Sequence, residues 1–167
     1  MEVKFSGGGE RKHCLRRWPK MEVKLKNREI DQGLGLVKPF LAKGLPVKLS
    51  FAIAKTIRRL KDIVEVLIEE RKKLVDQHQL TDIEGNAVAD EAGNIQFASP
   101  SKFADDFNEL MKQENEVDVH QIDYEKLTKM KDKDGRLIQP SPEELEGLLL
   151  LQMITEPEPE EKEEEEE

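Results

Sequence analysis

The stretch IAKTIRRLKDIVEVLIEERKKLVDQH, residues 53–78, decides the fold of this chain. It carries one stripe of mainly apolar positions spaced alternately four and three residues apart: Ile53, Ile57, Leu60, Val64, Leu67, Arg71, Leu74 and His78. This rhythm keeps one face of an α-helix directed at a partner helix. We therefore predict a long helix over residues 47–79, with Pro46 in its first turn.

The stripe resumes after a turn-rich segment, at Phe103, Phe107 and Leu110. Ser99-Pro100 supplies a cap residue followed by a proline, as at many helix starts. Two Gly-Asn pairs lie between the helices and predict a small β-hairpin. We expect a shorter helix over residues 100–115 to fold back antiparallel on the long one, bringing positions 60 and 107 close together.

A third helix is expected between the N-terminal segment and the long helix. Alternating residues 22–26 read as a short strand, for which residues 117–120 are a candidate partner. Asn27 is a plausible N-cap for a helix reaching Lys43. Gly33 and Gly35 weaken this helix and Pro39 is expected to kink it. It is the candidate cover for the part of the long helix that residues 100–115 cannot reach.

The C-terminal helix is predicted over residues 142–154. Ser141-Pro142-Glu143-Glu144 forms a capping box with proline at the first helical position. Its leucines lie on more than one face, so it must be buried or bound to a partner. The candidate partner-binding residues are Leu148, Leu149, Leu151, Met153 and Ile154.

Charge divides the chain into three parts. The formal net charge is −9, but residues 1–20 are Gly-rich and carry a net +4, whereas residues 155–167 carry −8. We predict a disordered basic extension over 1–20, a single elongated domain over 21–154, and a disordered acidic tail over 155–167. Met21-Glu22-Val23-Lys24 repeats Met1-Glu2-Val3-Lys4, which makes Met21 a candidate natural start. The Lys and Glu content is compatible with a thermophilic source.

No motif in the chain predicts a reaction. A single cysteine excludes an intrachain disulfide. Phosphate-binding loops, dinucleotide fingerprints and hydrolase motifs are not found, and Asp132-Lys133-Asp134-Gly135 lacks the later glutamate of a calcium loop. The sequence therefore predicts no enzymatic activity, metal or cofactor. No apolar run approaches the ~20 residues that span a bilayer.

Two charged segments suggest other partners. Lys55, Arg58, Arg59 and Lys61 form a possible anion or phosphate patch, although a solvated helix face explains them as well. Because no aromatic residue is interleaved with them, nucleic-acid binding is disfavoured. The acidic tail is either a solubilising brush or a nucleic-acid mimic that occupies a basic groove.

Several short strings resemble a family of small uncharacterised proteins of tailed phages and prophages of Gram-positive bacteria. The matching features, in order, are residues 23–27 (VKLKN), residues 45–55 (LPVKLSFAIAK), the long charged helix, residues 90–94 (DEAGN), the segment 117–122 and residues 141–145 (SPEEL). The resemblance implies a phage origin. It supplies neither an activity nor functional residues.

Together these observations predict an α+β fold, predominantly α, built on an antiparallel helical hairpin of the coiled-coil type. The expected function is that of a non-enzymatic phage-encoded accessory protein: a virion component, an assembly factor or a chaperone-like factor. Its partner would be a phage structural protein, a host protein or a second copy, in the host cytoplasm or the virion. The alternatives are an acidic inhibitor of a host defence or transcription complex, and a weak nucleic-acid-binding protein using residues 55–61.

Overall fold

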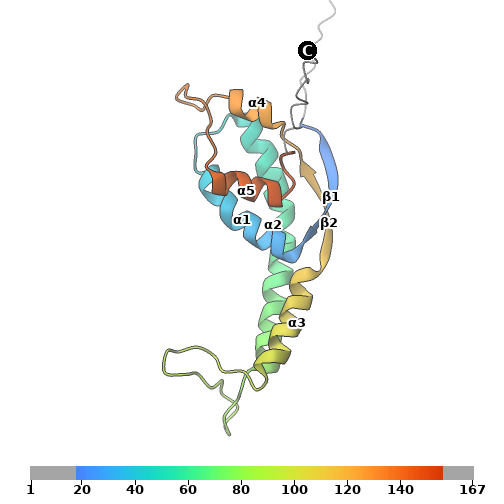
Figure 1. Cartoon of the computed structure of the whole chain (residues 1–167), viewed down its shortest axis with the longest axis vertical. Coiled ribbons are helices and arrows are strands. Elements are labelled where there is room, and N and C mark those ends of the chain that lie inside the picture. The colour runs from blue at the N-terminus through green and yellow to red at the C-terminus, as the bar shows by residue number, and fades with distance from the viewer. Residues whose placement is uncertain (1–17, 156–167) are drawn as a thin grey trace, which may run out of the picture.

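The computed structural model describes residues 18–155. The molecule is elongated, with a wide body at one end and a narrow arm at the other (Figure 1). Its elements are β1 (Lys20–Lys26), α1 (Asn27–Leu41), α2 (Val47–His78), α3 (Pro100–Lys112), β2 (Glu114–His120), α4 (Tyr124–Lys129) and α5 (Pro142–Leu150). The predicted α+β, predominantly α class is confirmed.

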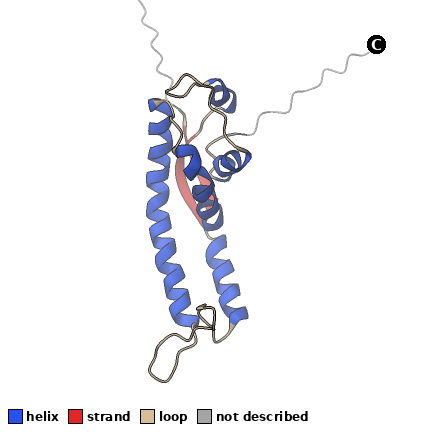
Figure 2. Ribbon diagram, turned by 90° about the vertical axis from the view of Figure 1, so that its left-hand side faces the viewer, coloured by secondary structure: helices blue, strands red, loops and turns tan. Residues whose placement is uncertain are grey.

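The helix α2 runs through both parts of the molecule (Figure 2). Its 32 residues make a rod of about 48 Å. In the arm, α3 lies antiparallel beside its C-terminal half, as predicted. The stripe faces inward, since Leu60 is 0% and Leu67 only 2% exposed.

The register of the hairpin differs from the expected one. Phe107 lies against Arg71, whose guanidinium is 5.7 Å from the ring centroid, and not against Leu60. The reason is length: the 13 residues of α3 start beside the end of α2 and reach back only about 20 Å. The prediction that positions 60 and 107 are neighbours is therefore wrong.

In the body, an antiparallel ribbon of β1 and β2 covers α2, and Val23 pairs with Val117. This pairing of the two short strands was predicted. The ribbon is fastened to the helix by polar contacts: the backbone N–H of His120 donates to Thr56 Oγ1 at 3.0 Å, and Arg59 donates to the Asp118 carbonyl at 2.8 Å. The helix α2 is thus covered by α1 on one side and by the ribbon on another.

The folded part begins before Met21, contrary to the predicted boundary. Lys20 is the first residue of β1, and Trp18 packs against the core. Both charged ends of the chain, residues 1–17 and 156–167, lie outside the described residues.

Asn27 is not the N-cap of α1, because that position is taken by Lys26. The Asn27 side chain instead donates to the Leu110 carbonyl at 2.8 Å and accepts from Asn115 Nδ2 at 2.8 Å. It therefore ties the start of α1 to the end of α3. The helix continues past Pro39 and ends at Leu41, not at Lys43.

Glycine is required where α1 crosses α5. A Cβ on Gly33 would come within 2.7 Å of Leu151 Cγ, and one on Gly147 within 2.8 Å of Leu36 Cβ. Gly33 lowers the intrinsic helix propensity of α1, but it permits this close packing. At Gly35, by contrast, an added Cβ would have no neighbouring atom within 4 Å.

The C-terminal helix is shorter than predicted. The capping box at Ser141 and Glu144 is present, but α5 ends at Leu150. Gln152 then adopts a positive φ of 51°, and Ile154 pairs in parallel with Ile122. The chain turns here so that the apolar residues after the helix face the core.

Four of the five candidate partner-binding residues at the C-terminus are buried within the chain itself, which is the first of the two alternatives expected for this segment. Leu148, Leu151 and Met153 are 0% exposed and Ile154 is 5% exposed, all within the chain's own core. Leu149 alone of the five is accessible, at 37%. Burial against α1 and the ribbon explains why this segment is apolar on more than one face.

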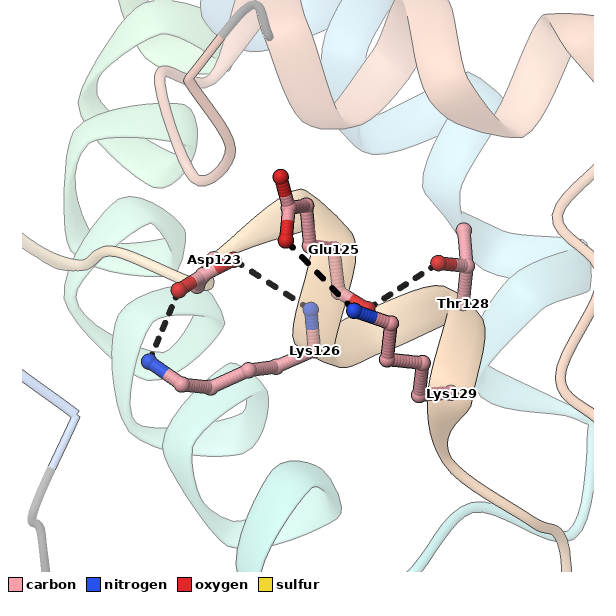
Figure 3. Close-up of polar contacts among 5 residues, drawn as sticks. All are labelled: Asp123, Glu125, Lys126, Thr128 and Lys129. Carbon is pink, nitrogen blue, oxygen red and sulfur yellow. Dashed lines mark hydrogen bonds and ion pairs between the residues drawn. The ribbon is translucent and has the colours of Figure 1, made fainter.

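The short helix α4, shown in Figure 3, was not among the predicted elements, because its six residues are too few to show an apolar period. Asp123 caps it by accepting from the Lys126 backbone N–H at 3.2 Å, and it pairs with the Lys126 ammonium at 2.7 Å. These contacts lower the pKa of Asp123. Thr128 donates to the Glu125 carbonyl at 3.0 Å.

The loop at the end of the arm is a ring of three extended segments and not a two-stranded hairpin. Three backbone hydrogen bonds close this ring. The Leu80 N–H donates to the Gln96 carbonyl at 2.7 Å, the Gln96 N–H to the Val88 carbonyl at 2.9 Å, and the Val88 N–H to the Leu80 carbonyl at 2.8 Å. Asp82 and Asp90 each accept two backbone N–H groups within their own turn, which lowers the pKa of both carboxyls. The same turn recurs in the body at Asp132, where the sequence suggested a calcium-loop fragment.

Candidate partner-binding surface

One side of α2 borders a trough that runs from the body into the arm. It consists of three hollows that share lining residues. The middle hollow lies between α1 and α2 and has a volume of about 430 Å³. It shares Leu41, Ile57 and Lys61 with a hollow of about 580 Å³ at the start of α2, and Asp31 with one of about 590 Å³ in the arm.

The middle hollow is lined by both apolar and charged side chains. Its apolar lining includes Leu34 from α1 and Ile57 and Val64 from α2. The charged side chains of Asp31, Lys38 and Lys61 line it as well. These apolar side chains are only partly buried against the core. Such a lining favours an apolar side chain from a partner, with acidic groups beside it.

The hollow in the arm, called here the arm cleft, is organised by Arg71. Its guanidinium pairs with Asp31 at 2.8 Å, contacts Met111 Sδ at 3.3 Å and lies over the Phe107 ring. Its Nε atom is buried and has no hydrogen-bond partner among the described residues. Arg28 closes the far side, donating to Asn108 at 3.2 Å.

Aromatic stacking fixes the wall of the arm cleft. Phe103 stacks on Phe97 with centroids 3.9 Å apart and lies 5.9 Å from Phe107. His78, at the end of α2, meets the edge of Phe103 and bonds Asp106 at 2.8 Å. His78 is therefore a seam residue, as the stripe predicted. Arginine, methionine and aromatic residues in one hollow are the composition typical of protein–protein hot spots.

The predicted basic patch is divided between two faces of α2. Arg58 and Lys61 line the trough. Lys55 and Arg59 lie on the ribbon side, where partial burial and then the charges of Arg59, Lys55 and Lys20 lower the pKa of His120. The four cations therefore do not form one anion site.

Sequence reasoning missed the trough because its residues come from three helices. One signal was available, since Arg71 is a charged residue inside an otherwise apolar stripe. Within residues 18–155 no three His, Cys, Asp or Glu side chains are grouped to hold a metal ion. Nor does this part of the chain contain a helix long and apolar enough to cross a bilayer. No family model, curated protein or solved structure matches the chain.

Proposed function

We propose that this protein is a non-enzymatic accessory protein that acts by binding another polypeptide along the α2 trough. The observation that carries the proposal is that three hollows, linked by shared lining residues, lie along one side of α2. From Ser50 to Val75 this face extends about 37 Å, the length of a helix of about 25 residues. An amphipathic helix lying in an apolar groove is a common mode of recognition.

A phage or prophage origin belongs to the same proposal. It is supported by the resemblance of residues 23–27, 45–55 and 141–145 to small proteins of tailed phages. A virion component, an assembly factor or a chaperone-like factor would work through such a surface, in the host cytoplasm or in the virion.

One specific observation favours nucleic-acid binding as a second candidate function. Phe51 is 61% exposed, and the Lys55 ammonium lies 4.5 Å from its ring centroid, so an aromatic is available beside the cations. Against this, Arg59 is engaged with the Asp118 carbonyl. Inhibition of a host complex by the acidic tail would act through residues outside the described structure.

Site-specific photo-crosslinking in infected or lysogenic cells tests the proposal. A photoreactive residue at Gln32, which lines the arm cleft, should capture a polypeptide. The same residue at Lys129 on α4, also exposed but not among the residues that line the trough, is the matched control. Equal capture from both positions, or none from Gln32, contradicts the proposal. Oligonucleotide binding that is lost in Phe51→Ala would favour the second candidate.

A further inference from the structure

The helix α2 carries a second stripe beside its buried one. Its members again alternate three and four residues apart: Val47, Ser50, Ala54, Ile57, Lys61, Val64, Ile68, Arg71 and Val75. This face borders all three hollows of the trough. Four heptads of such spacing are typical of a helix that packs against another helix.

Five positions of the second stripe are exposed, whereas Val75 and the three positions shared with the first stripe, Ile57, Val64 and Arg71, are half-buried. Val47 is 85% and Ile68 58% exposed, whereas Leu60 and Leu67 on the buried stripe are almost inaccessible. Phe51, beside the second stripe, is 61% exposed. Three of the large apolar side chains that remain exposed thus lie on or beside one face of one helix.

The charged residues along one edge of this face are complementary to the same residues of a second copy that runs in the opposite direction. Positions seven apart along its edge are Phe51, Arg58, Glu65 and Lys72. When a second copy of the helix is turned antiparallel about a point between residues 62 and 63, Arg58 of each copy comes within two residues, about 3 Å along the axis, of the level of Glu65 of the other.

We infer that the occupant of the trough is a second copy of this chain, bound as an antiparallel two-fold dimer through α2. The inference rests on the proposed function and names its partner. Ile57 of each copy packs against Ile68 of the other, and Lys61 against Val64. The Lys61 stem covers Val64 while its ammonium reaches toward Glu65 of the other copy.

The parallel arrangement is disfavoured by charge. A parallel in-register pair places each stripe position opposite its own copy. Lys61 would then face Lys61, and Arg71 would face Arg71, which brings like charges together. In the antiparallel pair, neither Lys61 nor Arg71 faces the same residue of the other copy.

Gly35 gains a role in this dimer. It lines the middle hollow, yet the described chain leaves open space around it. In an antiparallel pair the same flanks of both helices lie on one side, so the two α1 helices approach each other there. A glycine on the facing surface permits that approach, as Gly33 does at the α5 crossing.

Molar mass by light scattering and sedimentation equilibrium is the first test. The purified chain should have twice its monomer mass at micromolar concentration. Ile68→Glu should weaken the dimer at least tenfold, since it places a charge opposite Ile57. Val66→Glu is the matched control: Val66 is 59% exposed, two residues away and on another face of α2. Both side chains are exposed, so both variants should unfold at the same temperature as monomers.

Charge reversal tests the register. Arg58→Glu and Glu65→Arg should each weaken the dimer several-fold, and the double variant should restore it. Weakening by both single variants without rescue would overturn the proposed register.

Disulfide trapping tests the direction in a Cys14→Ser background. Ile57→Cys and Ile68→Cys together should link two chains on oxidation, because within one helix they lie about 16 Å apart. Either cysteine alone should link poorly. Efficient linkage by each single variant would indicate a parallel pair and overturn the inference.

A chain that remains monomeric at high concentration also overturns the inference. If Gln32 crosslinks to a different protein in cells, the proposed function stands and only the identity of the partner is wrong. If the chain is monomeric and Gln32 captures nothing, the proposed function falls as well.

Discussion

The same helix, α2, is buried very differently in the body and in the arm. In the body, α1 and the ribbon enclose it, and Leu49, Ile53 and Leu60 are fully buried. In the arm it meets α3, whose one buried side chain is Met111 and whose phenylalanines Phe103 and Phe107 are half-exposed. The contrast shows that continuity of a helix does not imply uniform stability along it.

Burial of apolar surface supplies most of the stability of a domain, at roughly 25 cal/mol per Å². The body therefore determines the global free energy of unfolding. The arm, held by an aromatic row and a few polar contacts, should open locally at lower cost. The predictions at Phe40 and Phe103 below test this division.

The largest effect is expected from Phe40→Ala in the body. Phe40 is the largest side chain that is completely buried, so its removal should cost about 3–5 kcal/mol of global stability. Urea unfolding followed by circular dichroism measures the loss. Phe107→Ala in the arm is the control and should cost clearly less. Equal losses from the two variants would show that the arm and the body form one cooperative unit.

A smaller effect is expected from Gly147→Ala at the crossing of α1 and α5. Its new Cβ would meet Leu36, Val37 and the Gly33 carbonyl, at a cost of about 1–3 kcal/mol. Gly35→Ala, in the monomeric Ile68→Glu background, should instead stabilise by up to about 1 kcal/mol. Thermal unfolding measures the stability of both variants. If both are destabilised, close packing at the crossing of α1 and α5 does not explain the requirement for glycine.

Phe103→Ala should have a local effect of about 1 kcal/mol, from lost aromatic stacking on Phe97 and Phe107. Amide hydrogen exchange should accelerate in α3 and in the last turns of α2. Exchange in β1 and β2 should not change. Faster exchange throughout the body would contradict the independence of the arm.

The smallest effect is expected from pH at His120. Partial burial, followed by the charges of Arg59, Lys55 and Lys20, lowers its pKa in the folded chain. The unfolded chain then binds the proton more readily, so stability should fall as the pH drops below about 6.5. Comparison of unfolding at pH 7.5 and 5.5 should show a smaller decrease in His120→Gln. If stability decreases as much in His120→Gln as in the unaltered chain, the decrease is caused by other titratable groups.

The sequence predicted the helical hairpin because a long periodic stripe has few alternative structures. The stripe positions of α2, the alternation within β1 and within β2, and the capping box at Ser141 were all recognisable locally. Residue Asn27 shows the limit of such reasoning. Asparagine is common at helix N-caps, but the hydrogen-bond partners of Asn27, Leu110 and Asn115, are more than 80 residues away in the sequence.

The candidate site was harder to predict for the same reason. Burial of Leu148 and Met153 depends on α1 and the ribbon, which periodicity within one segment does not reveal. The trough requires knowing which face of α2 the chain leaves uncovered. A sequence with two overlapping stripes does not say which of them faces the core.

The ring at the end of the arm is built on a repeat of eight residues. Leu80, Val88 and Gln96 are eight residues apart, and each turn is closed by its own aspartate. Removing one such octapeptide would leave two corners that pair as an ordinary hairpin, and adding one would supply a fourth corner with its turn already formed. The tip of the arm is thus modular: units could be gained or lost by duplication or deletion without altering the helices that carry it.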